Sequence, residues 1–280
     1  MAAPVQATYG FLGFFDILGY RQLLERNEIP TVIEVLRSKV GSLPTFTDRI
    51  FGRPLAEFKN ERASEVLRSL QWLSFADSIL LTMPVMHKEA PGIVSPGATA
   101  TGEIEPALEA GLFFFVATRL IFEMFSSGLP LRGAIHVGDF HVAPPFFAGA
   151  SITEAYELTM KQEWTGCALT AAAAERVTTL FRGENHDWLE LSLPRYDIPV
   201  KGGATIASRA VNWGFWAPWN YRHVTGVLRE AVIESFLKHK KTLSEKEFLK
   251  VTNTEVFLNY CKINARNSHP EPWQPLSGFV

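Results

Sequence analysis

The chain contains only two cysteines among its 280 residues. Cys167 and Cys261 lie far apart in the sequence, and neither has a CxxC neighbour or the spacing typical of metal ligands. Two such residues cannot build a disulfide framework. The scarcity of cysteine therefore excludes the small disulfide-stapled domains and indicates a fold held together by a hydrophobic core.

The chain also lacks an excess of charge of either sign. Its formal net charge is −2, so no overall basic field points to nucleic acid or to an anionic membrane surface as a partner. A nearly neutral total still allows a local phosphate-binding site. We expect no nucleic-acid partner and no membrane partner.

No apolar run is long enough to be a membrane span or a signal peptide. The most apolar stretch, residues 111–125, is interrupted by Arg119 and Glu123 and is too short to cross a bilayer. The N-terminal apolar stretch has no basic residues before it and contains Asp16. These features predict a globular cytoplasmic protein.

The patterns that are present predict a mixture of strands and helices. The short aromatic-rich run YGFLGFFDI (9–17) predicts a buried strand, and 70–85 predicts two strands joined by a tight hairpin near Asp77. The other expected elements are helices at 19–26, 31–43, 105–127 and 151–164 (the last with Ser151 as a possible cap), a strand pair at 131–142, a strand, a helix and further strands up to 213, helices at 223–239 and 244–264, and connections at 44–64 and 87–104.

This order of elements predicts an α+β fold close to the ferredoxin-like βαββαβ pattern, with helices packed on an antiparallel sheet. We expect a core domain over residues 9–213. Residues 214–280 are expected to form a C-terminal helical extension packed on that domain. The aromatic cluster at 212–219 is interpreted as a hydrophobic clasp between the two or as part of a dimer interface, rather than as a platform for a sugar or a base.

Asp16 and Asp77 are the residues that carry chemistry. Asp16 ends the first strand inside an apolar run, and Asp77 is at the tip of the hairpin that lies beside that strand in a βαββ sheet. Two neighbouring carboxylates repel unless cations intervene, and Mg²⁺ or Mn²⁺ prefer oxygen ligands. Each aspartate alone is also explained by a helix cap or a turn. Together they predict a site for metal-dependent phosphoryl transfer.

Several motifs resemble those of class III nucleotidyl cyclases, and within that group the pyrimidine cyclases of the bacterial Pycsar antiphage system. GFFDILGY (13–20) is similar to the first-strand signature of the family, and FADSILLT (75–82) to its hairpin with an aspartate at the turn. The following segments match more loosely over residues 9–213: LRGAIHVGDFH (131–141), FAGASITEAYELT (147–159) and VKGG (200–203).

The resemblance implies that Asp16 and Asp77 are catalytic and hold two Mn²⁺ or Mg²⁺ ions, with the backbone carbonyl of Ile17 as a further ligand. The ions would activate the ribose 3′-hydroxyl for attack on the α-phosphate and neutralise the leaving diphosphate. Backbone N–H groups of the 17–20 turn would bind phosphate oxygens. The nucleotide-binding residues implied in this way are Phe15, Leu18, Gly19, Tyr20, Arg132 and Lys201.

The chain departs from the purine cyclases of this class at the base pocket. Leu73 and Phe146 stand where those enzymes have residues that hydrogen-bond the base, and neither side chain can do so. Bulky apolar residues at these places favour a one-ring base. Tyr156, like Tyr20, is a further candidate for stacking on the base, although such aromatics are more often packing residues.

The family also has an asparagine and an arginine that stabilise the transition state, and this chain has Thr153 and Glu157 at those positions. Another cation therefore has to supply the charge, or the chain is an inactive member. Arg132 and Lys161 are the nearest candidates, although Lys161 is more simply explained as a solvated helix residue. The alternation of His136, Asp139 and His141 invites a metal-site interpretation, which lacks a convincing third ligand and is disfavoured.

The leading interpretation is a homodimer with composite active sites that converts UTP to 3′,5′-cyclic UMP and diphosphate. By the resemblance, this product would be a second messenger in antiphage defence and would activate a separate effector. Formation of cyclic CMP from CTP is the first alternative, and a catalytically inactive nucleotide-binding module of the same fold is the second. A dinucleotide cyclase is disfavoured, because FADSI lacks a Gly-Gly-acidic-acidic hairpin.

Overall fold

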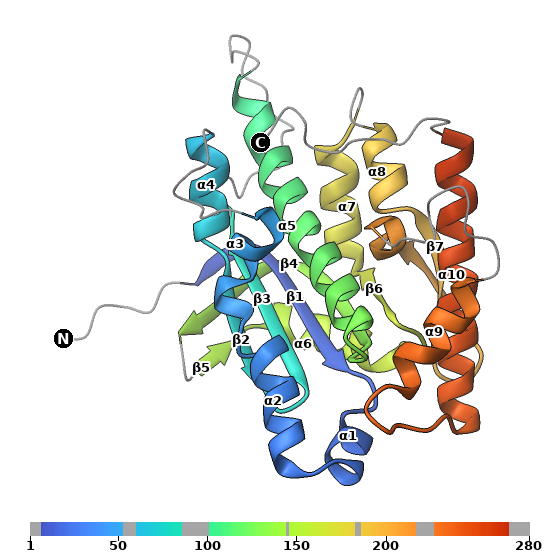
Figure 1. Ribbon diagram of the computed structural model, residues 1–280. Coiled ribbons are helices and arrows are strands. Elements are labelled where there is room, and N and C mark those ends of the chain that lie inside the picture. Colours follow the sequence, from blue (N-terminus) through green and yellow to red (C-terminus); the bar gives the residue numbers. More distant parts are fainter. Residues whose placement is uncertain are drawn as a thin grey trace.

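A computed structural model describes residues 7–52, 60–85, 101–143, 146–182, 186–216 and 227–268 (Figure 1). Its strands are β1 (Thr8–Ile17), β2 (Gln71–Phe75), β3 (Ser78–Pro84), β4 (Leu131–Ala143), β5 (Phe146–Ala148), β6 (Gly166–Leu169), β7 (Arg195–Pro199) and β8 (Thr205–Arg209). The helices are α1 (Tyr20–Arg26), α2 (Ile29–Lys39), α3 (Phe46–Phe51), α4 (Glu61–Arg68), α5 (Thr101–Ser126), α6 (Ala150–Lys161), α7 (Ala171–Leu180), α8 (His186–Ser192), α9 (Val227–Leu237) and α10 (Glu245–Ser268), with short 3-10 turns η1 (Leu43–Thr45) and η4 (Trp213–Trp216).

The main sheet has the strand order β2-β3-β1-β4-β5, and β6 pairs in parallel with β4. β1 is antiparallel to both β3 and β4. This order of β2, β3, β1 and β4 is that of a ferredoxin-like βαββαβ sheet, so the predicted α+β fold class is confirmed.

Helices cover both faces of the main sheet. α5 and α7 pack on one face and α6 packs on the other, as Figure 1 shows with α5 in front of the strands and α6 behind them. Alternate residues of β1 point to opposite faces. Phe11 and Phe15 therefore belong to the large core under α5, whereas Leu12 and Phe14 belong to a smaller apolar cluster that includes Ile152 of α6.

Three predictions for local structure are corrected. Residues 131–142 form one strand, β4, because this segment pairs with β1 along most of its length and with β5 and β6 on its other side. α6 begins after Gly149 without a side-chain cap, and the Ser151 hydroxyl donates to the Asp139 carbonyl at 2.8 Å instead. α6 ends at Lys161, because the next residues bridge to the segment before the β7–β8 turn.

Two predicted connections are only partly loops. The stretch 44–64 contains α3 and the start of α4, and 53–59 lies outside the described residues. The expected loop at 87–104 lies mostly outside them as well, and α5 starts at Thr101 rather than at 105.

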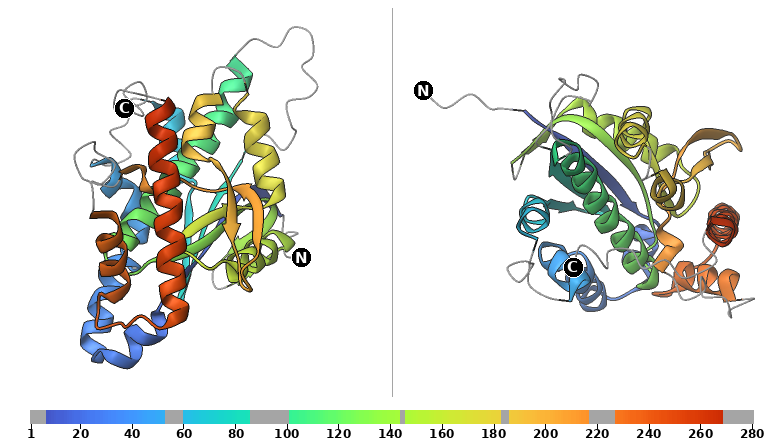
Figure 2. Two further views of the ribbon diagram at one scale, coloured as in Figure 1. Left: turned by 90° about the vertical axis from the view of Figure 1, so that its right-hand side faces the viewer. Right: turned by 90° about the horizontal axis from the view of Figure 1, so that it is seen from above.

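The C-terminal helices pack on the core, α10 running alongside β7 and β8 (Figure 2). Trp213 of η4 is fully buried, and its ring contacts that of Phe125 of α5 at a tilt of 49° with centroids 4.8 Å apart. The next residue, Gly214, lies against Leu258 of α10. This contact fits the interpretation of a clasp, while the rest of the cluster from 217 onward lies outside the described residues. The boundary at 213/214 between a core and an extension stays a prediction.

Candidate functional site

Asp16 lies at the end of β1 on the face of the sheet that α6 covers. It follows Leu12 and Phe14 in the alternation of β1, and only 7% of its surface is exposed. In the sheet it stands between Ser78 of β3 and Arg132 of β4. A carboxylate is therefore fixed in the middle of the sheet, where both neighbouring strands determine its surroundings.

Asp77 is brought next to Asp16 by the β2–β3 hairpin. The turn consists of Ala76 and Asp77, and Ala76 adopts a left-handed conformation with φ of 50°, as tight two-residue hairpin turns require. The backbone N–H of Ile17 donates to the Asp77 carbonyl at 2.8 Å. This bond ties the hairpin tip to the end of β1, and the predicted proximity of the two aspartates is found.

Arg132 forms an ion pair with Asp16. Its Nε donates to Asp16 Oδ2 at 2.8 Å, and both side chains are largely buried. Its two terminal nitrogens lie 3.3 Å from the Gln162 carbonyl and from Met160 Sδ. The guanidinium is thus held from two sides, and it in turn orients the Asp16 carboxylate.

The pKa of Asp16 is raised above its ordinary value. Burial raises it most, and the charge of Asp77 raises it further, whereas Arg132 and, more weakly, Lys250 of α10 lower it. The two carboxylates therefore interact across the site. A bound cation would relieve both the repulsion and the cost of burial.

Only some of the backbone N–H groups in the turn after β1 are free to bind phosphate. The N–H groups of Ile17 and Leu18 already donate to the carbonyls of Asp77 and Pro130, both at 2.8 Å. In the described part of the chain, no hydrogen bond is found for the amides of Gly19 and Tyr20, which leaves these two for a ligand. Gly19 has φ of 75°, a conformation that favours glycine.

The remaining predicted nucleotide contacts are dispersed. Phe15 is fully buried on the opposite face of the sheet, so only its backbone faces the site. The Tyr20 side chain packs against the large core. Lys201 is exposed in the β7–β8 turn, and its N–H donates to the Lys161 carbonyl at 2.9 Å, which places the VKGG segment beside the end of α6.

Leu73 and Tyr156, two of the three residues proposed for the base pocket, lie on the α6 side of the sheet. The third, Phe146, pairs with Ala143 of β4 and therefore points to the face opposite that of the neighbouring pair Val142 and Phe147. Leu73 packs against the small cluster around Phe14, and the Tyr156 ring meets Phe14 edge to face at a centroid distance of 5.4 Å. Phe146 is 73% exposed at the start of β5. Thr153 and Glu157 are exposed on the same helix as Tyr156.

The donor set fits a hard divalent cation. Asp16 and Asp77 supply carboxylate oxygens, and the adjacent Ile17 offers a carbonyl, which are ligand types that Mg²⁺ and Mn²⁺ prefer. Within the described residues no group of three or more His, Cys, Asp or Glu side chains is arranged to hold a metal ion. His136, considered as a ligand above, instead lies 3.0 Å from the Thr170 hydroxyl, and burial lowers its pKa.

Two residues near the site, distant in sequence from Asp16 and Arg132, were not identified by the sequence analysis. Gln162 binds Arg132 through its carbonyl and the Gly133 carbonyl through its side chain at 2.8 Å. Lys250 comes from α10, more than a hundred residues beyond β4. No local pattern separates Lys250 from the other lysines of its helix, so only the packing of α10 reveals it.

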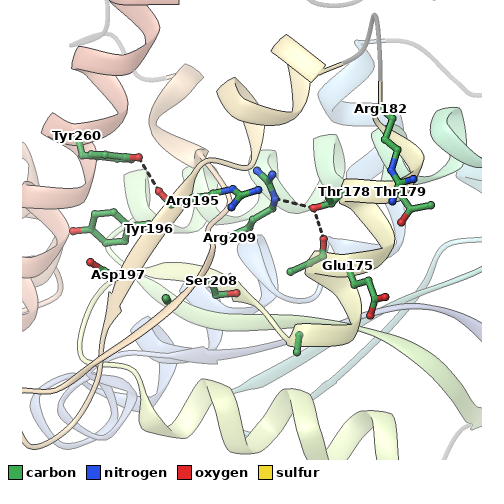
Figure 3. Close-up of a pocket in the computed structure, with 13 residues that line it drawn as sticks. Glu175, Thr178, Thr179, Arg182, Arg195, Tyr196, Asp197, Ser208, Arg209 and Tyr260 are labelled. Atoms are coloured by element: carbon green, nitrogen blue, oxygen red, sulfur yellow. Dashed lines mark hydrogen bonds between the residues drawn. The ribbon is translucent and has the colours of Figure 1, made fainter.

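A groove of about 800 Å³ lies elsewhere, between α7 and the β7–β8 hairpin (Figure 3). Its most deeply buried cation, Arg209, already binds the Thr178 hydroxyl, the Leu193 carbonyl and Glu190. None of the predicted site residues lines it. The lining residues are Ala171, Ala174, Glu175, Thr178, Thr179, Arg182, Arg195, Tyr196, Asp197, Ala207, Ser208, Arg209 and Tyr260.

Comparisons with known proteins find a similarity in structure but none in sequence. No protein-family model and no curated protein sequence matches the chain. Among solved structures, it is similar to the catalytic core of a rhodopsin-guanylyl cyclase with converted specificity, solved in complex with ATPalphaS. The two share 12% sequence identity with a TM-score of 0.40, over 74% of this chain and 96% of that one. Within the described residues, no helix has the length and apolar character needed to span a membrane.

Proposed function

We propose that this chain is a nucleotidyl cyclase of the class III type that converts UTP to 3′,5′-cyclic UMP and diphosphate. The observation that carries the proposal is the meeting of Asp16 and Asp77 at the end of β1, with Arg132 bound to one of them. The motifs that contain these residues are those that resemble the family.

The reaction needs a nucleophile, a leaving group and charge stabilisation. The ribose 3′-oxygen forms a bond to the α-phosphorus, and the bond from that phosphorus to its bridging oxygen breaks. The electron pair leaves with diphosphate, and the hydroxyl proton passes to solvent. Divalent ions, when bound, supply activation of the hydroxyl and neutralisation of the leaving group. Asp16 and Asp77 would hold them, and Arg132 would keep the Asp16 carboxylate in place.

A homodimer is part of the proposal, because the chain exposes aromatic surface beside the two aspartates. We call Phe75, Phe147 and Tyr156 the aromatic patch. Their exposed fractions are 39%, 38% and 46%. Phe75 stacks on Phe147 at a centroid distance of 5.3 Å, and both Phe75 and Tyr156 meet the Phe14 ring edge to face. Phe75 directly precedes the hairpin turn that carries Asp77. A second copy seated on this patch would complete the pocket for the base.

The base choice rests on the apolar character of positions 73 and 146. Leu73 and Phe146 offer no hydrogen bond to a purine edge, which favours a pyrimidine. UTP is preferred and CTP is the alternative substrate. By the resemblance to the Pycsar cyclases, the product would signal phage infection to a separate effector that binds the cyclic nucleotide.

A second candidate is an inactive nucleotide-binding module. Glu157, exposed on α6 where the family has a cationic residue, is the observation that favours it. Such a module would bind the nucleotide and form no product.

The test is incubation of the purified chain with each of the four nucleoside triphosphates and Mn²⁺, with the products identified by mass spectrometry. We expect cyclic UMP or cyclic CMP from the wild type. Asp16→Asn and Asp77→Asn should each lower the rate at least about 100-fold, because each removes a ligand charge on which transition-state stabilisation depends. Asp187→Asn, which changes an exposed carboxylate on α8, is the matched control.

Each other outcome has a defined meaning. Product from ATP or GTP in preference to the pyrimidines would refute the argument from Leu73 and Phe146. Binding of nucleotide without any product would favour the inactive module. Full activity of either site variant would refute the assignment of the aspartates.

A further inference from the structure

The C-terminal helix α10 is bonded to the segment that follows α6. Asn253 Nδ2 donates to the Glu163 carbonyl at 2.7 Å, and the Thr165 N–H donates to the Thr254 hydroxyl at 2.8 Å. Gln162, just before this segment, is the residue whose carbonyl accepts from Arg132. One face of α10 is therefore fixed beside the Asp16–Arg132 pair.

Lys250 lies one turn before Asn253 and Thr254 on this helix and is buried, with 7% of its surface exposed. Its backbone carbonyl accepts from the Thr254 hydroxyl at 2.7 Å. Within the described residues, no hydrogen bond or ion pair engages its ammonium group. A lysine side chain that is largely buried while its ammonium group has no direct protein partner is uncommon, so its presence calls for an explanation.

The neighbouring Glu163 is in a similar state. It is 4% exposed, and its Oε1 has no hydrogen-bond partner among the described residues. The structure thus contains a largely buried lysine and a buried carboxylate oxygen, both without direct bonds among the described residues, and the lysine lies close enough to Arg132 for that charge to lower its pKa. Polar groups left unsatisfied in this way are expected where a ligand is to be bound.

The charges of these groups interact through the protein interior. Burial lowers the pKa of Lys250, Glu163 raises it and Arg132 lowers it. The Lys250 charge in turn lowers the pKa of Asp16. Since such interactions fall off with distance, Lys250 belongs to the same electrostatic environment as Asp16 and Arg132.

We propose that Lys250 is a catalytic cation of this site and binds the diphosphate part of a nucleoside triphosphate. The proposal rests on the proposed function. Lys250 would supply the positive charge that the chain lacks at Glu157, and it comes from a helix outside the predicted core domain. As the bond between the α-phosphorus and its bridging oxygen breaks, the electron pair moves onto the diphosphate. The ammonium keeps its protons and stabilises this charge.

The test uses Lys250→Met in the full-length chain, with Lys246→Met as the matched control. Lys246 is on the same helix, one turn earlier, and is exposed. We expect the first variant to lower kcat about 100-fold, in the range found when one charge-stabilising donor is removed. Its melting temperature should be equal to or above that of the wild type, because an apolar side chain replaces a buried charge. The control should retain the wild-type kcat and melting temperature.

A second measurement separates this proposal from the proposed function. Binding of inorganic triphosphate is measured by calorimetry with the wild type and both variants, so that no turnover is needed. If the wild type binds triphosphate but cyclises none of the four nucleotides, the proposed function fails. The cationic role of Lys250 then stands if Lys250→Met alone weakens binding by about tenfold or more.

Three results overturn the inference. One is a kcat of Lys250→Met within about tenfold of the wild type where cyclisation is observed. Another is triphosphate binding that is absent in the wild type or equally tight in Lys250→Met. The third is loss of cooperative unfolding in Lys250→Met, which would assign the ammonium a role in the fold.

Discussion

Lys241 is buried between the end of α5 and the turn after β1. Only 5% of it is exposed, and its Nζ donates to the Gly128 carbonyl at 2.7 Å. A Cβ atom placed on Gly19 would lie 3.7 Å from this nitrogen. Lys241→Met keeps the length and the apolar stem of the side chain and removes only its charge. We expect this substitution to stabilise the protein at neutral pH.

The magnitude follows from the pKa of the group. Burial lowers the pKa of Lys241 from 10.5 to about 8. Between these two pH values the unfolded chain binds a proton that the folded chain has released, so the contribution of Lys241 to stability rises with pH. At about 1.4 kcal/mol per pKa unit, this rise amounts to about 3 kcal/mol. Loss of the bond to Gly128 costs about 1 kcal/mol. The net gain for Lys241→Met is therefore about 2 kcal/mol near neutral pH.

The assay is urea-induced unfolding of both proteins, followed by tryptophan fluorescence at several pH values between neutral and about pH 10.5. The quantity of interest is the difference in the free energy of unfolding between variant and wild type. Taking this difference removes the contributions of other titrating groups, which are the same in both proteins. One such group is Tyr196, whose pKa is raised by burial to about 12. It should shrink as the pH rises above about 8 and change sign before about 10.5.

Lys238→Met is the matched control for the same segment. Lys238 donates to the Ser126 carbonyl at 3.2 Å but is exposed, so its variant should follow the wild type at every pH. If the curves of wild type and Lys241→Met remain parallel from neutral pH to about 10.5, the argument from burial is refuted.

Two further predictions concern the candidate site. Arg132→Met should lower the free energy of unfolding by about 3 kcal/mol in urea titrations, because it leaves a largely buried Asp16 carboxylate without its partner. If Arg132→Met causes the same loss in an Asp16→Asn background, the ion pair contributes nothing to stability. Phe147→Glu should leave the fold intact, because Phe147 is 38% exposed on the short strand β5, but convert a dimer to a monomer in sedimentation equilibrium and reduce product formation in parallel. A variant that still dimerises and is fully active would exclude the aromatic patch as the interface.

Local patterns were sufficient to predict the part of the fold that holds the two aspartates. The aromatic-rich run ending at Asp16 has no Pro and is bounded by glycine, and the hairpin at Asp77 is a tight turn between two apolar runs. Both elements are specified by neighbouring residues in the sequence. Their adjacency then follows from the strand order of a βαββ sheet, which few topologies satisfy.

The extent of β4 and the end of α6 depend on contacts between distant segments, which local sequence patterns do not show. The segment 131–142 is expected from the sequence to form a strand pair, but it is one strand, β4, that contains Gly138. In the fold this glycine is needed for close approach, since a Cβ there would lie 2.5 Å from the Ser151 hydroxyl and 2.8 Å from His136 Nε2. The end of α6 is likewise set by a partner far along the chain, because the Glu163 N–H donates to the Pro199 carbonyl.

The charge balance of the site connects the C-terminal helices to the two aspartates. Burial and Asp77 raise the pKa of Asp16, and Arg132 and Lys250 oppose them. The first of these cations belongs to the sheet, but the second comes from α10, which is fixed by the bonds of Asn253 and Thr254. Lys250 is the weakest of these influences, and through it the packing of α10 bears on the pKa of Asp16. Under the proposal for Lys250, α10 contributes a positive charge to the site as well as covering the core.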